Sequence, residues 1–373
     1  MRSIAVIIPA LCLVPSAYAW GELGHETIAY VAQNFLSAAT VTWAQKILGD
    51  TSTSYLANAA TWADSYRYTT AGTFSQPYHF IDALDSPPSA CNVNYDRDCG
   101  TGGCVVRAIQ NYTSRVTETS LSSVQVQEAL QFIIHFLGDI HQPLHDENLD
   151  YGGNDIDVLY GSASTNLHAA WDTNMPEAYA GGYSLANAQT WANTLTTDIK
   201  TGTYKSQAAS WLENVDINSV IDSAMAWATE ANAYVCTVVI PGGVSSVQNK
   251  DLSTTYYKGV IPTIQLQYAR AGYRLAAWLN LIVTGSTGLD GSTPTSSHKT
   301  TTTKAKKLAA KTASVSPSPP SKPKKHHVDR RDAAVSPTPT PKKKHHVVRR
   351  NAATASPTPT AGLKEKKGHA KHA

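Results

Sequence analysis

Three things are scarce in the 373-residue sequence: long apolar runs, cysteine, and basic residues within the first 284 positions. Past residue 19, no stretch approaches the roughly 18 apolar residues of a transmembrane helix, so we expect no membrane span. The apolar run IAVIIPALCLV at residues 4–14 is too short for one. It follows Arg2 and precedes the small residues Ala17 and Ala19, which is the layout of a secretory signal peptide. We therefore expect residues 1–19 to be removed and a secreted, extracellular chain to begin at Trp20.

The five cysteines fit an exported protein. Loss of the leader removes Cys12 and leaves an even number, for which three disulfide pairings are possible. The segment between Cys99 and Cys104 is short and rich in glycine, so it can close on itself, which would pair Cys91 with Cys236. The alternative is four free, buried thiols. One N-glycosylation sequon, at Asn111, is weak evidence of a surface loop.

Basic residues are concentrated at the C-terminal end. From residue 285 onward there are 19 Lys and Arg against 4 Asp and Glu, whereas residues 1–284 have 12 against 24. The tail repeats with a period of 20 residues, with blocks starting at Ser316, Ser336 and Ser356. Such polar, proline-rich repeats cannot bury enough apolar surface to fold, so we expect a disordered tail over 285–373. It either contacts anionic polymers or is a solvated spacer that is trimmed at its paired arginines.

Residues 20–284 have the composition of a globular protein, and helical patterns dominate them. Apolar residues recur at three-and-four spacing over 123–140, which predicts an amphipathic helix. A second helix is expected over 261–283, opening at Pro262. Alternation is rare, and DIDVLYG at 155–161 is one short candidate strand. We expect a single compact, mainly α-helical domain.

Histidines beside carboxylates form the strongest chemical signal. His135 and Asp139 are four residues apart on the predicted helix, so both side chains project from one face. His168 and Asp172 repeat this spacing. Neutral imidazole and carboxylate are ligands that zinc accepts, and two such pairs within 40 residues indicate a metal site.

The segment after the predicted helix indicates a further ligand. Pro143 disfavours helix at the preceding residue, so the chain is expected to turn and bring His145 back toward the cluster, while His141 points off the face. A lone histidine is more often an ordinary core or surface residue. Upstream, TWADSYRY contains Asp64 and Arg67, and PYHFID contains His79 and Asp82, none of which would be singled out alone.

Taken in order, these motifs are similar to those of the secreted, zinc-dependent, single-strand-specific nucleases of fungi and plants. The shared segments are WGELGH at residues 20–25, WAD, HFID, HFLGDIHQPLH and NLHAAWD. They span residue 20 to about residue 284. The resemblance implies a mainly α-helical phospholipase C/nuclease fold with three zinc ions, and it says nothing about the basic tail.

The resemblance also implies the ligands of each zinc ion. One ion would bind Asp64, His79, His135 and Asp139, and a second would bind His145, His168 and Asp172. The third would bind His25, a bridging Asp139, and the α-amino nitrogen and carbonyl oxygen of Trp20. An α-amino group has a pKa of about 7.7–8.0 and can lose its proton to a metal, so removal of the leader would complete the site. The same family framework has the disulfides Cys99–Cys104 and Cys91–Cys236.

The implied activity is hydrolysis of phosphodiesters in single-stranded DNA and RNA to 5′-phosphate products, together with 3′-nucleotidase activity, through a zinc-bound hydroxide. Asp64 and Arg67 are the catalytic candidates, and Arg67 would stabilise charge on the phosphate unless it only pairs with Asp64. Phe80 and Asp82 would bind the base, although either could be a core or capping residue, and Asn154 would contact substrate. We expect a monomer.

Two other functions remain open at this point. A zinc-dependent phospholipase C would share the chemistry, and a non-catalytic protein that binds zinc or nucleic acid would share the fold. The acidic body is unusual for a nuclease, because phosphate binding normally uses Lys and Arg. Three divalent cations would reverse the local field.

Overall fold

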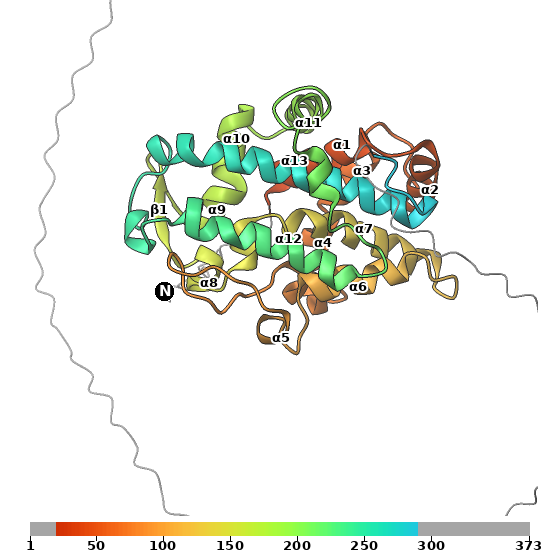
Figure 1. The fold of residues 1–373 in the computed structure, drawn as a ribbon, viewed down its shortest axis with the longest axis horizontal. Helices are drawn as coiled ribbons and strands as arrows, with labels where there is room; N and C mark the ends of the chain where they lie inside the picture. Colours follow the sequence, from red (N-terminus) through yellow and green to blue (C-terminus); the bar gives the residue numbers. More distant parts are fainter. Residues whose placement is uncertain (1–19, 290–373) are drawn as a thin grey trace, which may run out of the picture. The chain divides into compact units, whose positions relative to one another are not determined.

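A computed structural model describes residues 20–289, so the predicted leader and the predicted tail beyond residue 289 lie outside the described residues. Within that range the secondary structure is almost entirely helical (Figure 1). The α-helices are α1 (Glu22–Gln33), α2 (Ala38–Leu48), α3 (Tyr55–Ala60), α4 (Trp62–Tyr66), α5 (Tyr95–Asp98), α6 (Val105–Arg115), α7 (Ser123–Asp139), α8 (Asp150–Gly153), α9 (Leu167–Ala169), α10 (Met175–Ala180), α11 (Leu185–Lys200), α12 (Val220–Tyr234) and α13 (Thr255–Thr284).

Short helical turns join these helices. Four are 3₁₀ turns: η1 (Thr73–His79), η2 (Pro143–Asp146), η4 (Ala208–Leu212) and η6 (Val244–Ser246). Two are π turns: η3 (Ala170–Asn174) and η5 (Val235–Val239). The expected mainly α-helical, single compact domain is confirmed for the described residues. None of their helices is both long and apolar enough to cross a membrane.

Helix α1 lies at the centre of the fold. Residues 23–32 are all buried, including the polar residues His25, Glu26 and Thr27. Helices α3, α7, α11 and α13 pack around it. Burial on all sides fixes α1 in place, and with it the histidine at residue 25.

Helices α12 and α13 run alongside each other across the body (Figure 1). The rings of Trp227 and Trp278 meet edge to face with centroids 5.3 Å apart, and Arg274 forms an ion pair with Glu230 at 2.6 Å. Helix α6 packs against α12 and α7, and α7 packs against α13. The predicted helix over 123–140 is confirmed as α7, which a reciprocal Ser122–Gln125 capping box starts.

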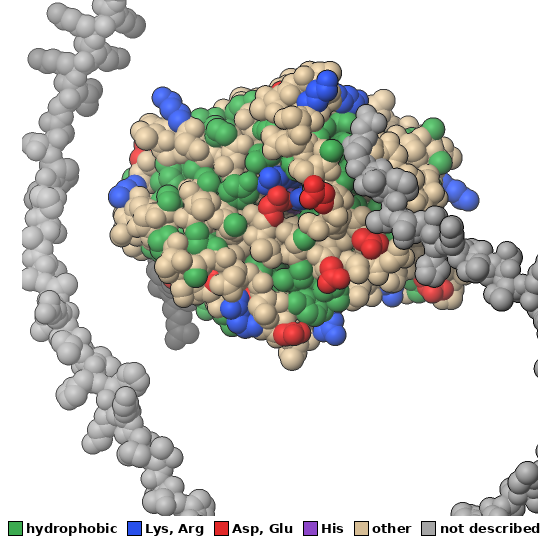
Figure 2. All heavy atoms as spheres, in the orientation of Figure 1, with side chains coloured by type: hydrophobic (Ala, Val, Ile, Leu, Met, Phe, Trp, Pro, Cys, Tyr) green, Lys and Arg blue, Asp and Glu red, His purple; other side chains and the backbone are tan. Residues whose placement is uncertain are grey.

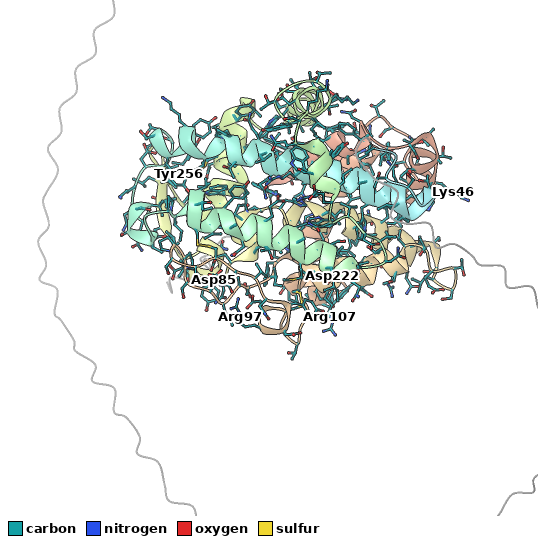
Figure 3. All side chains as sticks on the ribbon, in the orientation of Figure 1. Lys46, Asp85, Arg97, Arg107, Asp222 and Tyr256 are labelled. Carbon is teal, nitrogen blue, oxygen red and sulfur yellow. A yellow bond between two sulfur atoms is a disulfide. The ribbon has the colours of Figure 1, made fainter. Side chains whose placement is uncertain are left out.

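The predicted start of the last helix at Pro262 was wrong, because α13 begins seven residues earlier, at Thr255. Pro262 and Lys258 are both exposed, so the Lys258 carbonyl that loses its helical partner can bind water instead. Packing holds the first turn, where the Tyr256 hydroxyl donates to the Val239 carbonyl and accepts from the Trp171 indole, both at 2.8 Å. Tyr256 is marked at this end of α13 in Figure 3.

The predicted short strand within 155–161 is confirmed as β1 (Asp157–Tyr160). It pairs in antiparallel register with β2 (Ala163–Asn166), from Asp157 opposite Asn166 to Tyr160 opposite Ala163. Gly161 in the connecting turn has φ 63°, a left-handed conformation that glycine adopts without strain. The hairpin leads directly into α9 and so positions His168.

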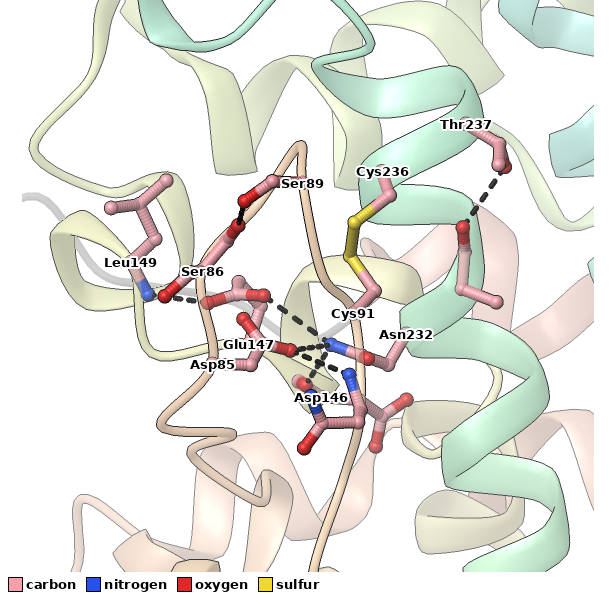
Figure 4. The surroundings of a disulfide bond; sticks show 12 residues. Asp85, Ser86, Ser89, Cys91, Asp146, Glu147, Leu149, Asn232, Cys236 and Thr237 are labelled. Atoms are coloured by element: carbon pink, nitrogen blue, oxygen red, sulfur yellow. Dashed lines mark hydrogen bonds between the residues drawn. A yellow bond between two sulfur atoms is a disulfide. The ribbon is translucent and has the colours of Figure 1, made fainter.

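Two disulfides are present, Cys91–Cys236 and Cys99–Cys104. The first ties the loop after η1 to η5, the π turn that follows α12 directly (Figure 4). One turn earlier on α12, the Asn232 amide donates to the Asp146 carbonyl at 2.9 Å and to the carboxylates of Asp85 and Glu147 at 3.2 and 3.3 Å. These contacts join the loop, η2 and α12 into one unit beside the site described below.

Asn111 was expected in a surface loop, but it lies on α6. The apolar residues Val105, Ile109 and Tyr112 recur at helical spacing and are buried, which leaves Asn111 on the exposed face of that helix. The sequon is therefore on the surface, although in a helix.

Candidate metal centre

The C-terminal end of α7 supplies two fully buried ligand candidates. His135 and Asp139 face the same side of the helix, with His135 Nε2 3.2 Å from Asp139 Oδ2. Helix α4 and the end of η1 bring Asp64 and His79 to the same point. His79 Nδ1 lies 3.0 Å from both Asp139 Oδ2 and His135 Nε2, and 3.7 Å from Asp64 Oδ1. Four donor atoms from three parts of the chain therefore converge there.

The second oxygen of Asp139 faces a different set of groups. Its Oδ1 lies 3.2 Å from His25 Nε2 on α1, and the His25 and His135 rings stack at 3.9 Å. Trp20 is completely buried next to them, with its indole donating to the Gly138 carbonyl at 3.1 Å. The following amide, of Gly21, donates to the Asp172 carbonyl at 3.0 Å. The main chain at residue 20 is thus held between α7 and η3.

A third group forms around the turn that Pro143 starts. The turn η2 brings His145 to the ring of His168, where the two stack at 4.9 Å. His168 Nε2 lies 3.0 Å from Asp172 Oδ2, although the helix between them changes from α to π. The other Asp172 oxygen accepts a hydrogen bond from the Gln142 amide at 2.7 Å.

Backbone carbonyls set the tautomers of three histidines. His135 Nδ1–H donates to the Ala60 carbonyl at 2.6 Å, His145 Nδ1–H to that of His79 at 2.8 Å, and His168 Nδ1–H to that of Gly152 at 2.7 Å. In each case the proton on Nδ1 leaves a lone pair on Nε2. Hydrogen bonds of this kind orient histidines that bind metals.

Metal cations fit these residues. The donor atoms fall into three groups, each within 4.8 Å: His25, His135 and Asp139; Asp64, His79 and His135; and His145, His168 and Asp172. Buried atoms of six of these residues have no hydrogen-bond partner among the described residues: His25 Nε2, Asp64 Oδ1, His79 Nε2, Asp139 Oδ1, His145 Nε2 and Asp172 Oδ2. Such groups are costly to bury unless a cation binds them.

The ionisation states agree with metal binding. Burial lowers the pKa of His25 and His145, and lowers that of His79 to about 4, so these rings are neutral at pH 7. Burial opposes ionisation of Asp139, yet the neighbouring histidines hold its pKa well below the usual range. Neutral imidazole and ionised carboxylate are the forms that bind zinc.

A cavity of about 480 Å³ opens next to the three groups. Its wall includes ligand candidates from two of the groups and all four of the other predicted site residues: Arg67, Phe80, Asp82 and Asn154. Arg67 is buried, and its Nη2 lies 3.3 Å from Asp64 Oδ1, so it both pairs with Asp64 and reaches the cavity. Burial and the Asp98 carboxylate raise the pKa of Asp82.

His141 lies apart from these groups. Its Nδ1–H donates to the Leu137 carbonyl at 2.8 Å, and its Nε2 accepts from Arg274 at 3.0 Å. Its ring stacks against Trp227. His141 therefore belongs to the core between α7, α12 and α13.

Sequence reasoning missed several residues of the site. Gln142 orients Asp172, and the wall of the cavity also contains Leu144, Glu147, Tyr151, Asp155 and Asn166. Gln142 and Leu144 lie within HFLGDIHQPLH and Asn166 begins NLHAAWD, but no role in the site was predicted for them. The role of Gln142 could have been predicted only from its place before Pro143. Proline holds the preceding residue in an extended conformation, which can direct the Gln142 side chain toward the cluster.

Comparison with known proteins agrees with this geometry. Residues 20–284 match the family model described as S1/P1 Nuclease. The chain is 54% identical to Nuclease S1 of Aspergillus oryzae over 281 residues, which cover 75% of this chain and 98% of the relative. It is 53% identical to Nuclease P1 of Penicillium citrinum over 263 residues, covering 70% and 97%. Endonuclease 3 of Arabidopsis thaliana is 30% identical over 285 residues, covering 75% and 94%.

These similarities favour neither phospholipase activity nor a silent binding protein. They extend over the segments that carry the three His/Asp groups and the cavity. The chain belongs to the S1/P1 nuclease family and is a hydrolytic nuclease.

Proposed function

We propose that the protein is a secreted endonuclease that cleaves single-stranded DNA and RNA to 5′-phosphate products and also removes phosphate from 3′-nucleotides. The observation that carries this proposal is that the three His/Asp groups lie next to a cavity whose wall contains a buried arginine, an aromatic ring and a carboxylate. The names of the relatives, nuclease and endonuclease, support the reaction class.

Zinc is the proposed metal, with three ions in each chain. Asp64, His79, His135 and Asp139 would hold one, and His145, His168 and Asp172 another. The third would be held by His25, Asp139 and the main chain of Trp20. Nitrogen and carboxylate donors in sets of three or four suit zinc, and Asp139 directs one oxygen to each of two groups. When bound, zinc lowers the pKa of water and neutralises charge on a phosphodiester.

Arg67 and Asp64 have complementary roles in this proposal. The Asp64 carboxylate holds the Arg67 guanidinium in the cavity wall, at 3.3 Å. Arg67 would then donate hydrogen bonds to the phosphate oxygens as negative charge builds up on them. Because the guanidinium is buried and already oriented, little reorganisation accompanies the reaction.

Phe80 and Asp82 would recognise a base. The Phe80 ring offers a stacking surface, and the Asp82 carboxylate can accept a hydrogen bond from an exocyclic amine. Asn154, in the same wall, would contact the substrate. Stacking on a side chain requires a base that is free of its own stack, which favours single strands over duplexes.

Residues 1–284 have an excess of acidic residues, so metal cations at the site, and not a basic groove, would attract the phosphates of the substrate. On the face drawn in Figure 2, Lys and Arg side chains are scattered, without a continuous stripe along which a strand could lie. Arg97 and Arg107 are two of these side chains, and both are labelled in Figure 3. Phosphate would be attracted by the local charge of the metals, so binding should depend less on salt than in proteins with basic grooves.

Maturation would complete the site. Removal of residues 1–19 frees the α-amino group of Trp20, whose indole is already fixed beside Asp139. We further propose that Asn111 carries a glycan, that the body is monomeric, and that the basic tail after residue 284 contacts anionic polymers. The tail proposal fails if deletion leaves binding to such polymers unchanged at low salt.

The central experiment measures zinc content, N-terminal sequence and activity on one secreted sample. We expect about three zinc ions per chain, Trp as the first residue, and faster hydrolysis of single-stranded than of duplex DNA. Asp64→Asn should abolish most activity, with His141→Asn as the matched control in the core. Faster hydrolysis of phosphatidylcholine than of single-stranded DNA would reject the proposal.

A further inference from the structure

A second cavity, of about 450 Å³, opens beside the one described above. Its wall consists of Arg67, Tyr68, Gln76, Pro77 and Phe80, and we call it the side cavity. Arg67 and Phe80 line both cavities, so the two cavities meet at these residues. The side cavity therefore adjoins the place where the proposed function puts the phosphate, yet that function gives it no role.

Tyr68 supplies an aromatic surface in the side cavity. Its side chain is 54% exposed, so the ring gains little from burial in the free protein and is accessible to a ligand. The Arg67 guanidinium lies over this ring, 5.1 Å from its centroid, at the distance of a cation–π contact. A planar group that stacks on the exposed part of the ring would thus lie beside the group proposed to bind phosphate.

The turn after α4 holds Tyr68 in this place. The Tyr68 amide donates to the Ser65 carbonyl at 3.3 Å, and the Gln76 side chain donates to the Arg67 carbonyl at 3.3 Å. The second bond joins the turn to η1, which ends at the proposed metal ligand His79. The ring of Tyr68 is therefore positioned by the same segments that position the metal centre.

The two cavities differ in charge. Carboxylates of Asp82, Glu147 and Asp155 line the first cavity, whereas Arg67 is the only charged residue that the described part of the chain contributes to the wall of the side cavity. An uncharged, planar group attached to a phosphate suits such a wall, because the phosphate pairs with the guanidinium and the planar group packs on the ring.

A phosphodiester carries one nucleoside on each side of phosphorus. Removal of phosphate from a 3′-nucleotide needs one base site, so the nucleoside linked through its 3′-oxygen takes the proposed site at Phe80 and Asp82. The nucleoside linked through its 5′-oxygen then extends from the phosphate in another direction. The side cavity borders the same arginine and is open to it.

We propose that the side cavity binds the nucleoside linked to the scissile phosphate through its 5′-oxygen, and that the base of this nucleoside stacks on Tyr68. This inference rests on the proposed function and extends the substrate site from one nucleoside to two. Stacking tolerates any base, so the second site adds affinity for a strand without adding sequence preference.

The test is equilibrium binding to the metal-loaded, full secreted chain, measured by calorimetry with two ligands that cannot be cleaved to 5′-phosphate products. One is diadenosine monophosphate in which a methylene group replaces the 3′-bridging oxygen. The other is the methyl ester of adenosine 3′-methylenephosphonate, which has the same charge and no second nucleoside. Stacking on one ring changes affinity by about five- to one-hundred-fold, so wild type should bind the dinucleoside about tenfold more tightly.

Tyr68→Ala should weaken binding of the dinucleoside by about tenfold and leave binding of the methyl ester within twofold of wild type. Tyr68→Phe should keep both affinities within twofold, because the ring is retained. Tyr179→Ala is the matched control, since Tyr179 is 39% exposed on α10 and lines neither cavity. Thermal unfolding and zinc content of each variant separate a binding defect from misfolding.

Two results would overturn the second nucleoside site. One is dinucleoside affinity in Tyr68→Ala within twofold of wild type. The other is an equal loss for both ligands, which would mean that Tyr68 only holds Arg67 in place. Binding does not require turnover, so a wild-type protein that fails to hydrolyse single strands would refute the proposed function, and the side cavity would still be judged on these affinities.

Discussion

Gly138 on α7 lies against His25 and Ile28 of α1, beside the metal centre. A Cβ atom added there would lie 2.9 Å from His25 Nδ1 and 3.1 Å from His25 Cε1. The His25 ring cannot move freely, because it is buried and stacked on His135 at 3.9 Å. Gly138→Ala should therefore displace His25 from Asp139, whose Oδ1 is 3.2 Å away.

The expected magnitude follows from two opposing effects. Overpacking of a dense core costs about 1–3 kcal/mol, and alanine recovers about 0.5–1 kcal/mol of helix propensity, so the net loss lies between about 0 and 2.5 kcal/mol and is centred near 1 kcal/mol. For a domain of this size, a loss of about 1 kcal/mol corresponds to a fall in Tm of roughly 2–4 °C. Zinc content should fall from about three ions to about two, because His25 is a proposed ligand of one ion.

Gly259→Ala provides the control for the helix-propensity effect. Gly259 lies on α13, and a Cβ there would meet nothing within 4 Å. This variant should be unchanged or slightly more stable and should keep its full zinc content. If Gly138→Ala matches it in both Tm and zinc, the argument that close packing positions His25 is wrong.

Three further predictions concern catalysis, disulfides and pH. Arg67→Met should lower kcat by roughly 10²–10³-fold without loss of zinc, and a change below threefold would exclude a role at the phosphate. Removing Cys91–Cys236, which spans 145 residues, should cost about 5 kcal/mol in denaturant unfolding, against about 2 kcal/mol for Cys99–Cys104, which spans 5; equal losses would refute this chain-entropy reasoning. In metal-free protein, burial lowers the pKa of His25, His79, His141 and His145, to about 4 for His79, whereas at His135 the Asp139 and Asp64 carboxylates outweigh burial and raise the pKa. Below pH 6.5 these four histidines bind more protons in the unfolded than in the folded state, so their contribution to the free energy of unfolding rises from pH 4 to 6.5, whereas Glu26 and Glu147, whose pKa burial raises to about 7 and about 8, contribute in the opposite direction. The rise over this range should therefore be smaller in His141→Asn than in wild type, and equal slopes in the two proteins would contradict the assignment.

Local patterns in the sequence predicted the parts of the site that depend on helical spacing. His135 and Asp139, four residues apart, lie on one face of α7 as predicted, because that helix is regular up to its last residue, Asp139. His168 and Asp172 also stay on one face, although the helix changes to a π turn between them. The wider π turn rotates the Asp172 side chain, but not far enough to move it to the opposite face. The convergence of His25, His79 and His135 came from the family resemblance, because periodicity within one helix carries no information on which other helices pack against it.

The features that escaped prediction share a physical cause. Pro262 is a helix breaker by propensity, but α13 stays continuous around it, because half-buried Tyr256 and buried Val260 pack on one side and solvent lies on the other. Tyr151 adopts a left-handed backbone conformation that tyrosine disfavours, and hydrogen bonds to Asn148 and Asn154 stabilise it. In both places specific contacts override the preference of the residue itself, through packing around α13 at Pro262 and through hydrogen bonds within the turn at Tyr151.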